Sequence, residues 1–422
     1  MFSTRALGIA GTAAAFLALT PALAANANSD HELDDHGRDG PVLEGRAVLA
    51  AQTYVDGPPS GLFFKPQSPI NGVTFPTPSQ PAIGYSGIVD GRSPGEYLAM
   101  PDNGYGNKLN SFDFELRAYY ITPDFKTAKG GTGGVTVGEY IAFRDPNNQA
   151  GFDIVHKDPA DPRHGLLTGT DFDPESIQRG PNGDLWLGDE FGPWILHFSA
   201  DGVLLEPPID MPDGLVSPAN PHIDPTKATV AGSRGLEGMA ISPNGETLTF
   251  ILEGAVLADA PVDAFSRRIY QYDIATGEFT RLADYRTEVA GHFVSDVQAL
   301  DNHRLVVIER DGGRGLTANF RNVYVVDPNR TGADGAAVKT LVVELAAIPD
   351  PDLVSLPAKN TGDVGLGDPF RVTCESIEAV HVISHARLLF GCDNNFPNTG
   401  RNPGPPFIAD DSEFIVVKVP GL

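Results

Sequence analysis

One short pattern recurs five times along this chain and restricts its fold more than any other feature. In the clearest copy, Asp173-Pro174-Glu175-Ser176-Ile177 begins an apolar stretch, and after a turn a second apolar stretch ends at Asp189-Glu190. The other copies begin near residues 86, 237, 295 and 375. A pattern that returns at similar spacing indicates an array of similar structural units.

Each copy predicts a unit of four short strands. In the second copy we expect strands at 174–179, 184–189, 194–199 and 203–206, separated by turns such as Asn182-Gly183. The third copy predicts strands at 237–242, 247–252, 268–273 and 279–283, and the fourth at 297–300, 304–309, 322–327 and 339–344. Repeated four-stranded antiparallel units are typical of the blades of an all-β propeller.

The last copy provides only three strands, at 375–383, 387–391 and 413–419, and a lone strand is predicted at 46–54. We expect this N-terminal strand to complete the last blade and close the ring, because closure removes a free sheet edge. Five repeats are visible. A sixth blade could lie within 57–84 or 145–170, which we interpret as long loops, so the sequence predicts five or six blades.

The N-terminal composition predicts export. Residues 1–24 have the basic start, apolar run and small-residue end of a signal peptide, and 25–45 are polar and expected to be disordered. The propeller domain is then 46–422. No later apolar run is long enough to span a membrane. We expect a secreted monomer, extracellular or periplasmic, with Cys374 and Cys392 joined across a hairpin as a disulfide; a reduced buried pair is the alternative.

The charge of the chain excludes some partners. It has 55 acidic and 30 basic residues, for a net charge of -25. A nucleic-acid partner is not expected, because binding to a phosphate backbone requires a basic surface. Metal cations are the natural partners of such a surface, although solubility alone explains the charge equally well.

Acidic residues occur at the start of the first strand and the end of the second, which share one rim in a propeller. We expect Asp296 and Asp311 at this rim together with eight candidate metal ligands: Asp102, Glu175, Asp189, Glu237, Glu253, Glu309, Glu375 and Asp393. Hard oxygen ligands favour Ca²⁺. Alternatively, these acids cap tight turns.

Three further residues are candidates for catalysis. Glu190 is the candidate base, and Arg234 and Arg310 are candidates for binding a substrate anion. Alternatively, both arginines pair with the neighbouring acids and hold loops. The sequence contains no G-x-S-x-G, P-loop or H-E-x-x-H motif.

Several of these segments resemble the phytase-like family, also called esterase-like activity of phytase. The similar segments are 171–176, 188–193, 234–238, 102–106 and 393–396, within a resemblance that spans about 47–419. It implies a secreted or periplasmic propeller that hydrolyses esters or phosphate esters.

We therefore expect a Ca²⁺-dependent hydrolase of a small anionic ester, with phosphate esters such as phytate favoured. Two alternatives are a non-catalytic extracellular Ca²⁺-binding propeller that binds a ligand or protein, and a metal-dependent sugar lactonase.

Overall fold

The computed structural model describes residues 40–65, 67 and 69–422, and the described part of the chain is almost entirely β-structure. Its helices are three 3₁₀ turns of three residues each. No described helix has the length and apolarity needed to cross a membrane. The expected signal peptide lies outside the described residues. The expected disordered segment lies mostly outside them, but its last residues belong to strand β1 (Val42–Leu49).

Among the described residues, 20 of the 24 strands form five sets of four antiparallel strands. The other four form two short pairs: β2 (Tyr54–Val55) with β3 (Gln80–Pro81), and β14 (Ser266–Arg267) with β17 (Tyr285–Arg286). The first set is β4 (Tyr85–Asp90), β5 (Tyr97–Pro101), β6 (Arg117–Asp124) and β7 (Gly134–Ala142). The second is β8 (Pro174–Arg179), β9 (Leu185–Asp189), β10 (Trp194–Phe198) and β11 (Ile209–Asp210). The third is β12 (Gly238–Ile241), β13 (Thr247–Ile251), β15 (Ile269–Asp273) and β16 (Phe279–Arg281). The fourth is β18 (Phe293–Ala299), β19 (Leu305–Arg310), β20 (Arg321–Thr331) and β21 (Ala337–Glu344). The fifth is β22 (Ser376–Ser384), β23 (Arg387–Asp393), β24 (Ser412–Lys418) and β1.

The first strands of these sets follow one another around a centre. β4 contacts β8, β8 contacts β12, β12 contacts β18, β18 contacts β22, and β22 returns to contact β4. Buried apolar residues fill the space between neighbouring sets, and one such cluster joins Leu187 of the second set to Met100 of the first. The all-β, propeller-like fold expected from the repeats is therefore confirmed.

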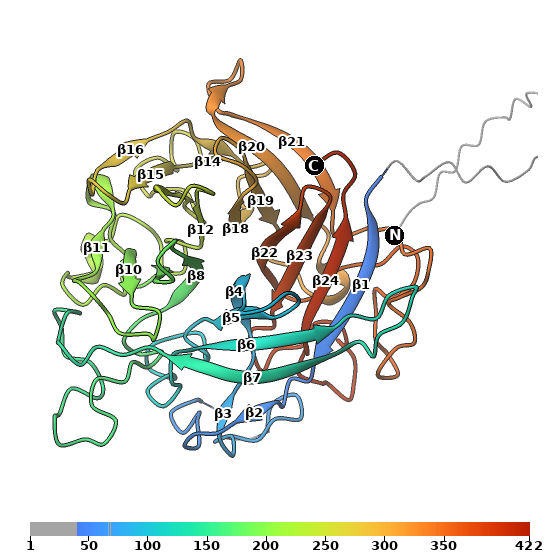
Figure 1. Ribbon diagram of the computed structural model, residues 1–422, viewed down its shortest axis with the longest axis horizontal. Helices are drawn as coiled ribbons and strands as arrows, with labels where there is room; N and C mark the ends of the chain where they lie inside the picture. The colour runs from blue at the N-terminus through green and yellow to red at the C-terminus, as the bar shows by residue number, and fades with distance from the viewer. Residues whose placement is uncertain (1–39, 66, 68) are drawn as a thin grey trace, which may run out of the picture. The chain divides into compact units, whose positions relative to one another are not determined.

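Strand β1 connects the two ends of the described chain. It pairs antiparallel with β24 from Val42 opposite Lys418 to Leu49 opposite Ser412, so β1 (blue) lies beside β24 (red) in Figure 1. A single parallel pair, Val48 with Gly134, joins β1 to β7 and merges the first and fifth sets into one mixed eight-stranded sheet. β1 begins before residue 46, where the strand was expected to start, and ends at Leu49 rather than at residue 54.

Some strand predictions were wrong or shifted. The segment 203–206 does not form the fourth strand of its set, because Val203 bridges Arg144 and Leu204 forms only an isolated bridge to Phe198. The two-residue strand β11 takes that place, pairing with Trp194 and Ile195. The described residues of 57–84 form one strand, the two-residue β3 (Gln80–Pro81), and the stretch 145–170, described throughout, holds no strand, so both are loops as expected.

The predicted disulfide is confirmed. Cys374 and Cys392 are bonded, with their Cα atoms 6.1 Å apart. Cys392 lies near the end of β23, opposite Ile377 of β22, and both sulfurs belong to the buried core between the fourth and fifth sets. The bond holds together the start of the first strand and the end of the second, where the site described below is formed.

The first strands carry irregularities at their starts that shape this site. Pro174 pairs with Asp189 and Ser176 with Gly188, so Glu175 is an extra residue in β8. In the same way Glu378 lies between the paired residues Ile377 and Ala379 of β22. A β-bulge changes the direction of a side chain that regular pairing would point to one face of the sheet.

Candidate functional site

A cavity of about 330 Å³ lies where the first strands begin and the second strands end. Nine carboxylates and two arginines line it: Asp102, Asp173, Glu175, Glu190, Glu237, Glu253, Glu375, Glu378, Asp393, Arg234 and Arg310. The carboxylates come from the first, second, third and fifth sets, whereas the fourth set contributes Arg310 from the end of β19. The shared rim therefore collects these residues from every set.

The carboxylates form three overlapping groups. The first is Asp102, Asp173 and Glu175, the second is Glu175, Glu237 and Glu378, and the third is Glu190, Glu237 and Glu253. In each group one oxygen per residue lies within 4.8 Å of the others. Glu175 and Glu237 each belong to two groups, so they are the centre of the arrangement.

Burial of so many acids changes their protonation. Burial, with the nearby Asp173 carboxylate, raises the pKa of Asp102 to about 8. Burial, with Asp189, raises the pKa of Asp173 to about 7. The pKa values of Glu175 and Glu237 are also raised by burial and by neighbouring carboxylates. Near neutral pH such a cavity holds protons, or it holds cations that replace them.

The two arginines are placed differently. Arg310 is buried, and its guanidinium contacts Glu378 at 2.7 Å, Glu253 at 3.3 Å and Ser295 Oγ at 2.6 Å. Arg234 keeps 35% of its side chain exposed and donates to Glu253 at 2.8 Å. Both guanidinium groups lie over the ring of Phe293. Arg310 therefore offsets the buried charges of Glu253 and Glu378, while Arg234 is open to the cavity.

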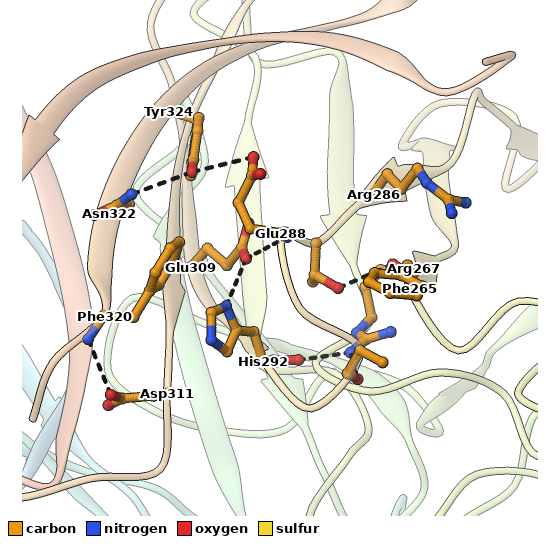
Figure 2. A network of polar contacts seen from close by, with 12 residues as sticks. Phe265, Arg267, Arg286, Glu288, His292, Glu309, Asp311, Phe320, Asn322 and Tyr324 are labelled. Carbon is orange, nitrogen blue, oxygen red and sulfur yellow. Dashed lines mark hydrogen bonds and ion pairs between the residues drawn. The ribbon is translucent and has the colours of Figure 1, made fainter. Parts of the chain in front are cut away.

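Two of the predicted metal ligands do not line the cavity. Asp189 accepts backbone N–H groups of Asp173 and Gly192, both at 2.8 Å, so it caps the turn after β9. Glu309 is fully buried, accepts from the backbone N–H of Glu288 at 2.7 Å and lies 2.9 Å from His292 Nδ1 (Figure 2).

Glu309 also accepts from Tyr285 Oη at 2.7 Å and pairs with Lys339 at 3.1 Å. Asp296 and Asp311, also expected at the rim, likewise accept hydrogen bonds from backbone N–H groups. Asp296 accepts from Val380 N at 2.7 Å, and Asp311 accepts from Phe320 N at 2.9 Å. For Asp189, Asp296 and Asp311 the capping alternative describes the observed contacts, whereas Glu309 is held mainly by the side chains of Tyr285, His292 and Lys339.

The other predicted residues lie together in the cavity, although Glu375 is turned toward Arg314 at 2.7 Å and Asn398 at 2.9 Å. Sequence reasoning missed Asp173 and Glu378. Asp173 stands two residues before Glu175 in the same segment. Glu378 is the one acid in the mainly apolar stretch Ile377 to Ile383, and that interruption was the available signal.

Comparison with known proteins gives a family match over most of the described domain. Residues 80–396 match the family described as "Phytase-like: Esterase-like activity of phytase". An "Uncharacterized secreted protein" of Arthroderma benhamiae is 25% identical over 193 residues, covering 36% of this chain and 37% of that protein.

Two solved structures show a distant likeness. Regucalcin of Agrobacterium tumefaciens, titled a calcium-binding protein, is 13% identical with a TM-score of 0.37, covering 89% of this chain and 95% of that one. A putative 6-phosphogluconolactonase from Bacteroides uniformis is 12% identical with a TM-score of 0.35, covering 83% and 90%.

Proposed function

Because the chain belongs to the phytase-like family, described by the esterase-like activity of phytase, we propose that it is a Ca²⁺-dependent hydrolase of small anionic esters. Phosphate esters such as phytate are the favoured substrates. We propose that the five sets are the blades of a five-bladed propeller whose acidic mouth is the active site. The grouping of seven buried or half-buried carboxylates, with Glu175 and Glu237 at its centre, carries this proposal.

The residues at the mouth fit a hard cation. Carboxylate oxygens are the ligands that Ca²⁺ prefers, and buried like charges require protons or cations to offset them. Six residues would hold cations: Asp102, Asp173, Glu175, Glu237, Glu253 and Glu378. Asp393 borders the same cavity and is retained as a further candidate. When bound, a cation would supply positive charge that attracts the ester anion and polarises it.

The remaining residues have separate proposed roles. Arg234 would bind the substrate anion, since its guanidinium is open to the cavity. Arg310 would position Glu253 and Glu378. Glu190 would move the proton: its Oε1 accepts from Gly235 N at 3.2 Å, and its Oε2 has no donor among the described residues.

We also propose that the protein is exported. The signal-peptide pattern of the first 24 residues, the Cys374–Cys392 disulfide and the relative named as secreted all support this.

The test combines a hydrolysis screen with one substitution. The purified protein should hydrolyse a phosphate ester in Ca²⁺ and lose that activity in chelator. Glu237→Gln should lower Ca²⁺ affinity in calorimetry by about tenfold or more and reduce turnover, because two of the three groups lose a charge. The control Glu278→Gln changes an exposed glutamate outside the cavity and should behave as the unaltered protein.

Full activity toward phosphate and carboxylate esters in excess chelator would contradict the proposal. An absence of turnover, together with a rise in Tm on adding Ca²⁺, would instead identify a non-catalytic calcium-binding protein.

A further inference from the structure

A second cavity of about 140 Å³ shares a wall with the acidic mouth. Asp102, Gly106, Asp393 and Asn395 line both cavities. Cavities near this size hold a molecule about as large as benzene. A ligand in the mouth could therefore place a small group of atoms in the second cavity.

Asn394 presents an unpartnered acceptor in the wall of this second cavity. Its side chain is almost completely buried, at 1% exposure, and its Nδ2 donates to the Asp410 carbonyl at 2.8 Å. This donation sets the orientation of the amide. Asn394 Oδ1 then receives no hydrogen bond from any described residue. A buried acceptor left without a donor is unfavourable, so this atom indicates a ligand that donates or carries positive charge.

The two carboxylates beside Asn394 have the same character. Asp102 Oδ1 accepts from Gly104 N at 2.7 Å, and Asp393 Oδ1 accepts from Asn395 N at 2.9 Å. The second oxygen of each has no donor in the described part of the chain. No lysine or arginine among the described residues lines this cavity. The polar wall therefore carries two carboxylates and the unpartnered Asn394 oxygen, with no positively charged side chain among the described residues to offset them.

The lining of this cavity also includes aromatic side chains. Phe64, Tyr105 and Phe396 line it, and the ring centroids of Phe64 and Tyr105 are 5.6 Å apart. The hydroxyl of Tyr105 is bonded to Ser60 Oγ at 3.1 Å. Aromatic rings attract organic cations, whereas Ca²⁺ requires a shell of oxygen ligands. This aromatic lining therefore favours an alkylated ammonium group over a second metal ion.

We propose that this second cavity binds a small organic ammonium group, with its charge facing Asp102, Asp393 and Asn394 and its alkyl groups against Phe64, Tyr105 and Phe396. Since the cavity adjoins the mouth, and resting on the proposed function, the substrate is then an anionic ester of an amino alcohol. The anion lies at the mouth and the ammonium group lies in the second cavity.

Direct binding tests this without requiring turnover. Choline is titrated by calorimetry into the full chain in excess Ca²⁺, beside its uncharged isostere 3,3-dimethylbutanol. Choline should bind. The isostere should bind at least about tenfold more weakly, because it fills the same volume without charge. Equal binding of the two compounds, or no binding of choline, overturns the proposal.

A pair of neighbouring substitutions locates the site. Phe64→Leu removes an aromatic face and should weaken choline binding by about 3-fold to 30-fold. Phe63→Leu is the matched control: Phe63 is 43% exposed, packs on Phe112 and does not line the cavity, so choline affinity should not change. The rise in Tm with choline gives a second readout in case calorimetry is too weak. Equal affinities in the two variants would show that choline binds elsewhere.

The two proposals fail separately. Choline binding without hydrolysis of any ester retains the ammonium site and removes the enzyme assignment. Hydrolysis of simple phosphate esters without choline binding does the reverse. Competition by phosphocholine alone identifies a soluble ester, whereas choline-reversible sedimentation with phosphatidylcholine vesicles identifies a lipid headgroup.

Discussion

Gly84 is the residue where backbone conformation and site geometry meet. Its φ is +61°, and a Cβ atom there would lie 2.6 Å from Asp393 Oδ1. We expect Gly84→Ala to lower the free energy of unfolding by about 1–2 kcal/mol, because alanine would have to adopt the left-handed backbone conformation. Displacement of Asp393 should cost about 1–3 kcal/mol more. Urea denaturation measures the sum.

Gly72 offers the matched control for this prediction. Its φ is +85°, and an added Cβ meets no atom of the described residues within 4 Å. Gly72→Ala should therefore show the backbone cost alone. If both alanine variants lose the same stability, the close approach of Gly84 to Asp393 has no energetic consequence.

At the scale of elements, the site depends on how the first strands begin. The bulges at Glu175 and Glu378 turn acidic side chains out of regular pairing, and β8 and β22 both contact β4. Arg310, the last residue of β19, then bridges to Glu253 of the third set and Glu378 of the fifth. This buried ion-pair network joins strands that share no backbone pairing.

Loss of Arg310 should therefore be costly. Arg310→Gln leaves Glu253 and Glu378 buried without their cation, and we expect a loss of about 3–5 kcal/mol in the free energy of unfolding, measured by urea denaturation in chelator. Arg304→Gln is the control, since Arg304 is 41% exposed and its pair with Asp301 should contribute about 0–1 kcal/mol. A similar small loss in both variants would mean that the mouth does not depend on this charge.

At the scale of the whole molecule, the acidic mouth should make stability depend on pH. The pKa of Asp102 is raised to about 8 and that of Asp173 to about 7, above their values in an unfolded chain. Between about pH 4 and pH 8 the native state therefore binds more protons than the unfolded state, and the free energy of unfolding falls as pH rises.

We thus expect the Tm of the protein in chelator to fall between pH 5 and pH 8. Excess Ca²⁺ should restore it most strongly at pH 8, because cations then bind ionised carboxylates without competing protons. Differential scanning calorimetry at several pH values measures both effects. If the Tm in chelator rises or stays constant over this range, the carboxyl groups of the mouth do not have raised pKa values in the native state.

Most of the strand positions were predictable from local pattern. The strand 174–179 was placed without error, and the pairing of the N-terminal strand with the last set was inferred from a missing fourth strand. Such features depend on neighbouring residues and on closing a sheet edge. The segment 203–206 could not be assigned in the same way, because Arg144, distant in the chain, bridges Val203.

The amino-acid sequence by itself determined the repeat, the disulfide and the rim at which acids gather, because these follow from short-range periodicity and spacing. Only the tertiary structure decided which acids face the cavity. Asp189 and Glu309 accept hydrogen bonds from nearby donors and do not line the cavity, whereas Asp173 and Glu378 line the cavity. The physical reason is that bulges and partners from other sets direct each side chain, and neither is encoded in local alternation.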